Sequence, residues 1–230
     1  MIPGGFRKYV TDLKTFPHDA VRAWRSAGAV GVWLETRRRT LARVGGCSRY
    51  LVIEADLPAM REIPVPDGIE IQPFSGGDWT LLGDLGGHRL TRCFAAAAAA
   101  GRVCLVAWRG STAVGYIWFS PAIETRYENF TLPLPPDAIY LWQIQVSRSE
   151  RRRGVGASLV SFGLRMAGRQ GYRRSWMVTR GDNRAAQGTI ASVASSRVLG
   201  TVRRIKVTSW MHTRFMALSS PRPLQAASTS

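Results

Sequence analysis

The sequence has little cysteine and little histidine. Its 230 residues include only Cys47, Cys93 and Cys104, an odd number without C-x-x-C spacing. A framework of disulfides is therefore not expected, and the three thiols are typical of a reduced, cytoplasmic protein. The three histidines do not stand at ligand spacing from cysteines or carboxylates, so we expect no metal site.

Long apolar runs are also missing. The alanine-rich run Phe94–Gly101 is far shorter than the roughly 20 residues that a membrane-spanning helix needs. The first residues show no apolar stretch with a small-residue cleavage site, so no secretory signal is expected. These absences predict a cytoplasmic protein without a membrane span.

Acidic residues are few, since 15 Asp and Glu stand against 32 Lys and Arg and give a net charge of +17. Such a charge attracts polyanions, among them nucleic acid, anionic lipid and phosphorylated ligands. It also fits a compositional bias that carries no function, because nearly all of the basic residues are arginine. They are spread along the chain without a nucleic-acid-binding motif, so we do not expect nucleic acid as a partner.

What is present is typical of a globular protein with a substantial core. Hydrophobic residues make up 45% of the chain and aromatic residues 10%. The length suits one domain with an extension, or two small domains. We predict a helical extension with a short strand over residues 1–60, a domain over residues 61–218 and a flexible tail over residues 219–230.

Apolar periodicity predicts the order of the elements. Helical spacing covers residues 18–43, as one helix or as two shorter ones because Gly28 and Gly31 weaken it, and a short strand follows at residues 49–57. Next come a strand (69–74), an interrupted helix pair (78–100), a hairpin (103–108 with 113–119) and an inner strand (139–146). They are followed by a helix (155–169), a strand (175–179), a helix (182–199) and a strand pair (201–206 with 213–218). Residues 121–137 contain four prolines and predict a long loop.

The most distinctive segment, residues 145–157, reads QVSRSERRRGVGA. It joins the inner strand to the next helix through a tight basic turn. Free amides and the positive end of the helix dipole then point at one spot, which favours a bound phosphate. Glycine lets a pyrophosphate approach the backbone closely. A solvated basic turn without a ligand is the alternative. The expected phosphate site comprises Arg151, Arg152, Arg153, Gly154, Val155, Gly156 and Ala157.

This order of elements, together with Arg151, Gly154 and Gly156, resembles the GCN5-related N-acetyltransferase (GNAT) superfamily. The signature of that family is Gln or Arg, two residues, Gly, one residue, and Gly or Ala. Val146 stands where the strand of the family ends. The resemblance covers about residues 69–218. It implies a mixed α+β fold, in which helices flank a central, mostly antiparallel twisted sheet, here with an N-terminal helical extension.

The resemblance also implies an N-acyltransferase that uses acetyl-CoA or another acyl-CoA. The amine of an acceptor would attack the thioester directly in a ternary complex. Backbone groups of Ile144 and Val146 would pair with the pantetheine arm, and Asn183 would bind the pantetheine or cap its helix. The identity of the acceptor and a homodimer are left open.

The catalytic positions depart from the family pattern. Members often carry a Glu on the central strand and a Tyr on the last helix, whereas this chain has Gln143 and Gln145 on the strand and no Tyr on the helix. The candidates are Gln143, Glu124 and Tyr140, although the last two also fit a surface and a core residue. The missing carboxylate keeps a second function open, a catalytically silent acyl-CoA-binding or regulatory module.

Overall fold

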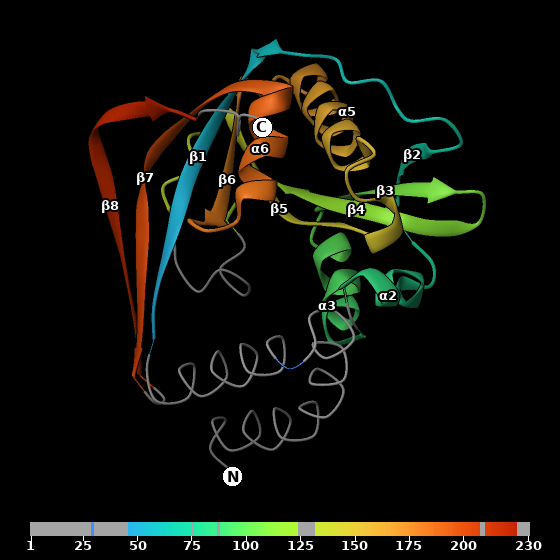
Figure 1. Ribbon diagram of the computed structural model, residues 1–230, viewed down its shortest axis with the longest axis horizontal. Helices are drawn as coiled ribbons and strands as arrows, with labels where there is room; N and C mark the ends of the chain where they lie inside the picture. The colour runs from blue at the N-terminus through green and yellow to red at the C-terminus, as the bar shows by residue number, and fades with distance from the viewer. Residues whose placement is uncertain are drawn as a thin grey trace. The chain divides into compact units, whose positions relative to one another are not determined.

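Figure 1 shows a computed structural model of the chain, which describes residues 29, 46–74, 76–86, 88–123, 132–207 and 210–224. The chain divides into two compact units, Met1–Arg49 with Arg203–Arg214, and Tyr50–Val202 with Phe215–Ser230. Apart from residue 29, which is helical, the predicted helix over residues 18–43 lies outside the described residues. No helix in the described ranges is long and apolar enough to cross a bilayer.

One sheet organises the described residues. Its eight strands follow the order β2-β3-β4-β5-β6-β1-β7-β8. The ladder between β5 and β6 is parallel, whereas those joining β2 to β3, β3 to β4, β4 to β5 and β6 to β1 are antiparallel. This arrangement confirms the predicted mixed α+β class. The elements are β1 (Gly46–Met60), β2 (Glu70–Pro73), η1 (Trp79–Leu82), α2 (Gly83–Gly86), α3 (His88–Ala99), β3 (Val103–Arg109), β4 (Thr112–Ser120), β5 (Ala138–Val146), η2 (Arg148–Glu150), α5 (Val155–Arg169), β6 (Arg174–Arg180), α6 (Arg184–Val193), β7 (Ala194–Val207) and β8 (Trp210–Pro223).

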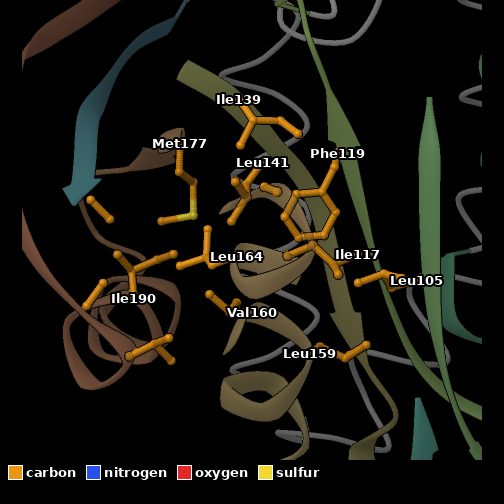
Figure 2. Close-up of a cluster of buried hydrophobic side chains, with 14 of the residues drawn as sticks. Leu105, Ile117, Phe119, Ile139, Leu141, Leu159, Val160, Leu164, Met177 and Ile190 are labelled. Carbon is orange, nitrogen blue, oxygen red and sulfur yellow. The ribbon is translucent and has the colours of Figure 1, made fainter. Parts of the chain in front are cut away.

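Helices cover both faces of the central strands. On β5, Ile139 and Leu141 point to the face of α5 and α6, where they join the cluster of aliphatic side chains in Figure 2. Tyr140 and Trp142 point to the face of α3 and join an aromatic cluster. We call these the aliphatic core and the aromatic core. Because β5 is buried on both faces, it reads as a nearly continuous apolar run.

Two predicted boundaries are wrong. The helix expected to reach residue 199 ends at Val193, and β7 begins at the next residue. Burial alternates from Ala194 to Arg197, as in a strand, and Arg197 Nε donates to the buried Glu54 of β1 over 2.9 Å. Strand pairing therefore overrides the helical pattern of the sequence. In addition, the strand expected to end at residue 218 continues to Pro223 in β8.

The predicted division at residues 60 and 218 stays a prediction. The structure adds that β1, predicted as a short strand in the extension, has 15 residues and lies between β6 and β7 within the sheet. Its register against β6 pairs Tyr50 with Arg180 and Asp56 with Arg174. The strand is therefore an inner element of the sheet.

Helix α5 lies unusually close to β4. A Cβ added at Gly163 would meet the Phe119 ring at 1.9 Å, and the ring is buried. A Cβ at Gly168, in the same helix, would be 3.9 Å from Leu57 and in ordinary contact.

We therefore expect Gly163→Ala to destabilise the protein by about 1–3 kcal/mol, because a core that is already filled has to shift. Gly168→Ala is the matched control and should be neutral or stabilising by up to about 1 kcal/mol, since Ala favours helix over Gly. Urea unfolding of both variants measures the difference. Equal stabilities would show that α5 does not lie this close to β4.

Candidate functional site

A bulge interrupts β5 at its centre. Tyr116 of β4 pairs with Gln145 and Trp118 pairs with Trp142, so two residues of β5 oppose Ile117 alone. One of the two, Gln143, has a φ of 52°. A non-glycine residue in the left-handed region is strained, and such bulges bend a strand and change the direction of its side chains.

Beyond the bulge, β5 separates from β6. Their parallel ladder ends at the pair Leu141 and Met177. Ser147 N donates to Val114 O on the opposite neighbour, β4, over 2.8 Å. Since bonded and non-bonded pairs alternate along an antiparallel ladder, the backbone groups of Val146 and Ile144 point away from β4. They face the space between β5 and β6, where the two strands no longer pair.

A cavity of about 220 Å³ occupies this separation. Side chains from both faces of the sheet line it, because the paired strands no longer close the sheet there. Ile144 and Ile190 belong to the face of the aliphatic core, whereas Trp142 and Val178 belong to the face of the aromatic core. The full lining is Tyr50, Ile117, Leu141, Trp142, Gln143, Ile144, Val160, Met177, Val178, Thr179, Arg180, Asn183, Ala186, Thr189 and Ile190.

The basic turn leads from β5 into α5. Its residues 151–154 are exposed, and two of them are left-handed, Arg152 with a φ of 64° and Gly154 with a φ of 88°. Ser158 N makes a helical bond to Gly154 O, and no side chain caps the helix start. The amides of residues 153–157 donate to no backbone or side-chain acceptor in the described part of the chain. Five donors and the positive end of the helix dipole thus remain available to an anion.

Gly156 connects the turn to the cavity. A Cβ added there would lie 3.6 Å from Val146, 3.8 Å from Thr189 and 4.0 Å from Ile144. These are ordinary contacts, so packing within the chain does not require a glycine at this position. Thr189 and Ile144 also line the cavity. Gly156 therefore lies between the turn and two residues of the cavity wall.

The three arginines of the turn have different surroundings. Arg151 Nε donates to Val146 O over 3.2 Å, which holds its side chain along the end of β5. Arg153 Nη1 lies 3.7 Å from Glu150 Oε2. Arg152 is exposed and has no partner among the described residues. It is the arginine most available to a ligand at the turn.

The structure brings some of the predicted site residues together and leaves others apart. Gln143 lines the cavity, and so does Asn183, whose Oδ1 accepts from Ala186 N over 3.2 Å and caps α6. Tyr140 is fully buried in the aromatic core and does not line the cavity. Glu124 lies outside the described residues.

The cavity is poor in groups that exchange protons. Among the described residues that line it there is no Asp, Glu, His, Cys or Ser. Arg180 is held by Asp182 through bonds of 3.0 and 2.6 Å. Tyr50 is the one phenol, and the sequence did not indicate it because it reaches the cavity through the pairing of β1 with β6. The described residues also contain no group of three or more His, Cys, Asp or Glu arranged to hold a metal ion.

Comparison with known proteins points to one family. Residues 78–192 match the model of the Acetyltransferase (GNAT) family. No curated protein matches the sequence.

Similar solved structures share the fold at low identity. A Drosophila protein has a TM-score of 0.55 at 14% identity, covering 80% of this chain and 68% of its own. The GCN5-related glucosamine N-acetyltransferase region of a fungal multi-domain GH3 β-N-acetylglucosaminidase has a TM-score of 0.52 at 11% identity, covering 76% of this chain and 22% of its own. A GNAT-family acetyltransferase from Colwellia psychrerythraea has a TM-score of 0.50 at 14% identity, covering 90% of this chain and 74% of its own.

The left-handed residue in the bulge yields a test of the site's backbone. Gln143→Gly should change the free energy of unfolding by less than about 1 kcal/mol, because the relief of strain offsets the greater freedom of the unfolded glycine. Gln143→Val should destabilise by about 1–3 kcal/mol, since a β-branched residue tolerates this conformation poorly. Denaturant titrations compare the two, and a valine variant as stable as the glycine variant would contradict the bulge.

Proposed function

Because the chain belongs to the GNAT family of acetyltransferases, we propose that it is an acyl-CoA-dependent N-acyltransferase that acts on an amine. We propose acetyl-CoA as the donor and a cytoplasmic location. The observation that carries the proposal is the row of five unbonded amides at residues 153–157, next to a cavity that opens between two strands. An anion and an extended chain can be held there together.

The residues fit CoA on physical grounds. A pyrophosphate would accept from the amides of residues 153–157, with Arg152 adding charge-assisted hydrogen bonds. The pantetheine arm would extend β5 as an added strand, because the backbone groups of Ile144 and Val146 point into the separation. Asn183 contacts the same space from the start of α6. The absence of a side chain at Gly156 lets the ligand approach the backbone between the turn and the cavity.

The residues around the cavity support direct transfer. Bound acetyl-CoA supplies an acyl thioester. The described lining has no Cys or Ser to take the acyl group onto the protein, which favours direct attack by the amine. Gln143 stands at the bulge, where its amide can orient the acceptor or a water molecule that removes a proton. Glu124 remains a candidate base, whereas the burial of Tyr140 away from the cavity disfavours it.

One observation favours a second function. No carboxylate or imidazole is found among the described residues that line the cavity, so an acyl-CoA-binding module without turnover would have the same geometry. The two functions make different predictions for thiol release. A transferase should produce free CoA in proportion to acylated acceptor, while a module should bind acyl-CoA and release none.

The decisive experiment combines mass spectrometry of the CoA species that co-purify with the protein and an acceptor screen. We expect an acyl-CoA to co-purify, and we expect at least one class of amine to give an acylated product with free CoA. Tight binding without product in every class would favour the module. Absence of binding to acetyl-CoA and to longer acyl-CoAs would refute both functions.

A substitution at Gly156 tests the proposed CoA path. Gly156→Val should weaken CoA binding at least about tenfold while the protein stays folded, because an added Cβ makes only ordinary contacts within the chain but narrows the passage between the turn and the cavity. Gly188→Val is the matched control, since it places the same residue in α6, where an added Cβ meets nothing within 4 Å. Calorimetric titration measures both, and equal affinities would exclude this path.

A further inference from the structure

We propose that Glu150 is a positioning residue for the phosphate-binding turn: by pairing with Arg109 it holds residues 151–157 in the conformation that presents their amides to the ligand. This role rests on the proposed function. It explains why a buried acidic side chain lies beside a site that is expected to bind an anion.

The pairing of Glu150 is close and shielded from water. Its side chain is only 7% exposed. Arg109 donates to both carboxylate oxygens, Nε to Oε1 and Nη2 to Oε2, at 2.9 Å each. This two-bond geometry fixes direction as well as distance. The Arg109 guanidinium also holds the pKa of the Glu150 carboxyl below its usual value. The carboxylate is therefore charged and oriented at neutral pH.

Arg109 is itself fixed in place. It ends β3, and its Nη1 donates to Asp67 O over 3.4 Å. A Cβ added at Gly68 would be 3.0 Å from the same nitrogen, and the φ of that glycine is 71°. The backbone of the connector between β1 and β2 thus passes directly over the guanidinium.

The connector is bound to α5 in turn. Ser158 Oγ donates to Pro64 O over 2.8 Å. Ser161 Oγ donates to Arg61 O over 3.2 Å and accepts from Ile63 N over 3.1 Å. Strand β3, the connector and α5 therefore form one frame, and Glu150 attaches the turn to it.

The turn needs such an attachment because it is strained. Arg152 is a non-glycine residue with a φ of 64°, two positions after Glu150. Conformations of this kind persist only where the surroundings impose them. Glu150 holds the beginning of the turn, and the bond from Arg151 Nε to Val146 O holds the next residue. Without Glu150 the turn can relax, and the ligand then has to order the amides as it binds.

Charge and positioning predict opposite results at Glu150. A carboxylate near bound phosphates repels them, so its neutralisation should tighten binding if only charge matters. If Glu150 holds the turn, its neutralisation should loosen binding in spite of the lost repulsion. The sign of the change in affinity therefore decides between the two.

The test uses Glu150→Gln and Arg109→Lys in the full chain, with Glu62→Gln as the matched control. Glu62 pairs with Arg165 of α5 but is exposed and outside the turn. Lysine at position 109 keeps both charges and loses the two-bond geometry. Calorimetry with CoA, and separately with inorganic pyrophosphate, measures affinity at one salt concentration. Melting temperatures report folding.

We expect Glu150→Gln and Arg109→Lys to weaken the binding of CoA and of pyrophosphate about tenfold or more, which is the size expected for a lost charge-assisted hydrogen bond. Glu62→Gln should stay within about twofold of the unmodified protein. With an acceptor in hand, KM for acyl-CoA should rise while kcat changes little, because the reacting atoms lie elsewhere.

Each other outcome overturns a definite statement. Folded Glu150→Gln protein that binds both ligands as tightly as the unmodified protein, or more tightly, refutes the positioning role and leaves the proposed function intact. If that variant does not fold, Arg109→Lys decides in the same way. Pyrophosphate binding without CoA binding by the unmodified protein refutes the proposed function, and the role of Glu150 is then judged on pyrophosphate. Binding of neither ligand refutes both.

Discussion

The separation of β5 from β6 after only four paired residues is the constraint on which the site depends. Parallel neighbours in a sheet normally continue to pair, because unpaired backbone groups cost free energy wherever water is excluded. Here the left-handed Gln143 adds a residue to β5 and ends the pairing. Of the backbone groups thus freed at Ile144 and Val146, Val146 O accepts a hydrogen bond from Arg151 Nε. A gap maintained in this way, between two helices, is suited to an extended ligand.

Local patterns in the sequence predicted the part of the site that depends on local chemistry. The basic turn and the helix over residues 155–169 were predicted correctly, because glycines, charge and a 3.6-residue period lie within one short stretch. The same holds for the hairpin of β3 and β4. The later helix was predicted too long, since the end of α6 at Val193 is imposed by the pairing of β7 within the sheet. Its cause lies far away in the sequence.

The remaining features depend on contacts that no spacing reveals. The φ of Gln143 follows from the register of β4 against β5. Tyr50 reaches the cavity through strand β1. In the sequence Glu150 is one acidic residue among arginines, and only the structure shows that it pairs with Arg109. A family signature describes the backbone that binds the shared ligand. Other side chains of the cavity, such as Tyr50, come from distant elements, and for this reason the sequence did not indicate them.

The interior position of β1 changes what counts as the smallest independent folding unit. The family match begins at residue 78, well after this strand. Yet β1 lies between β6 and β7, and its Tyr50 forms part of the cavity wall. A fragment that began at the matched region would lose the middle of its own sheet. It would leave β3, β6 and β7 each without a neighbouring strand, and such unpaired edges are prone to association between molecules. The residues upstream of the recognisable family sequence thus complete the sheet as well as shaping its cavity.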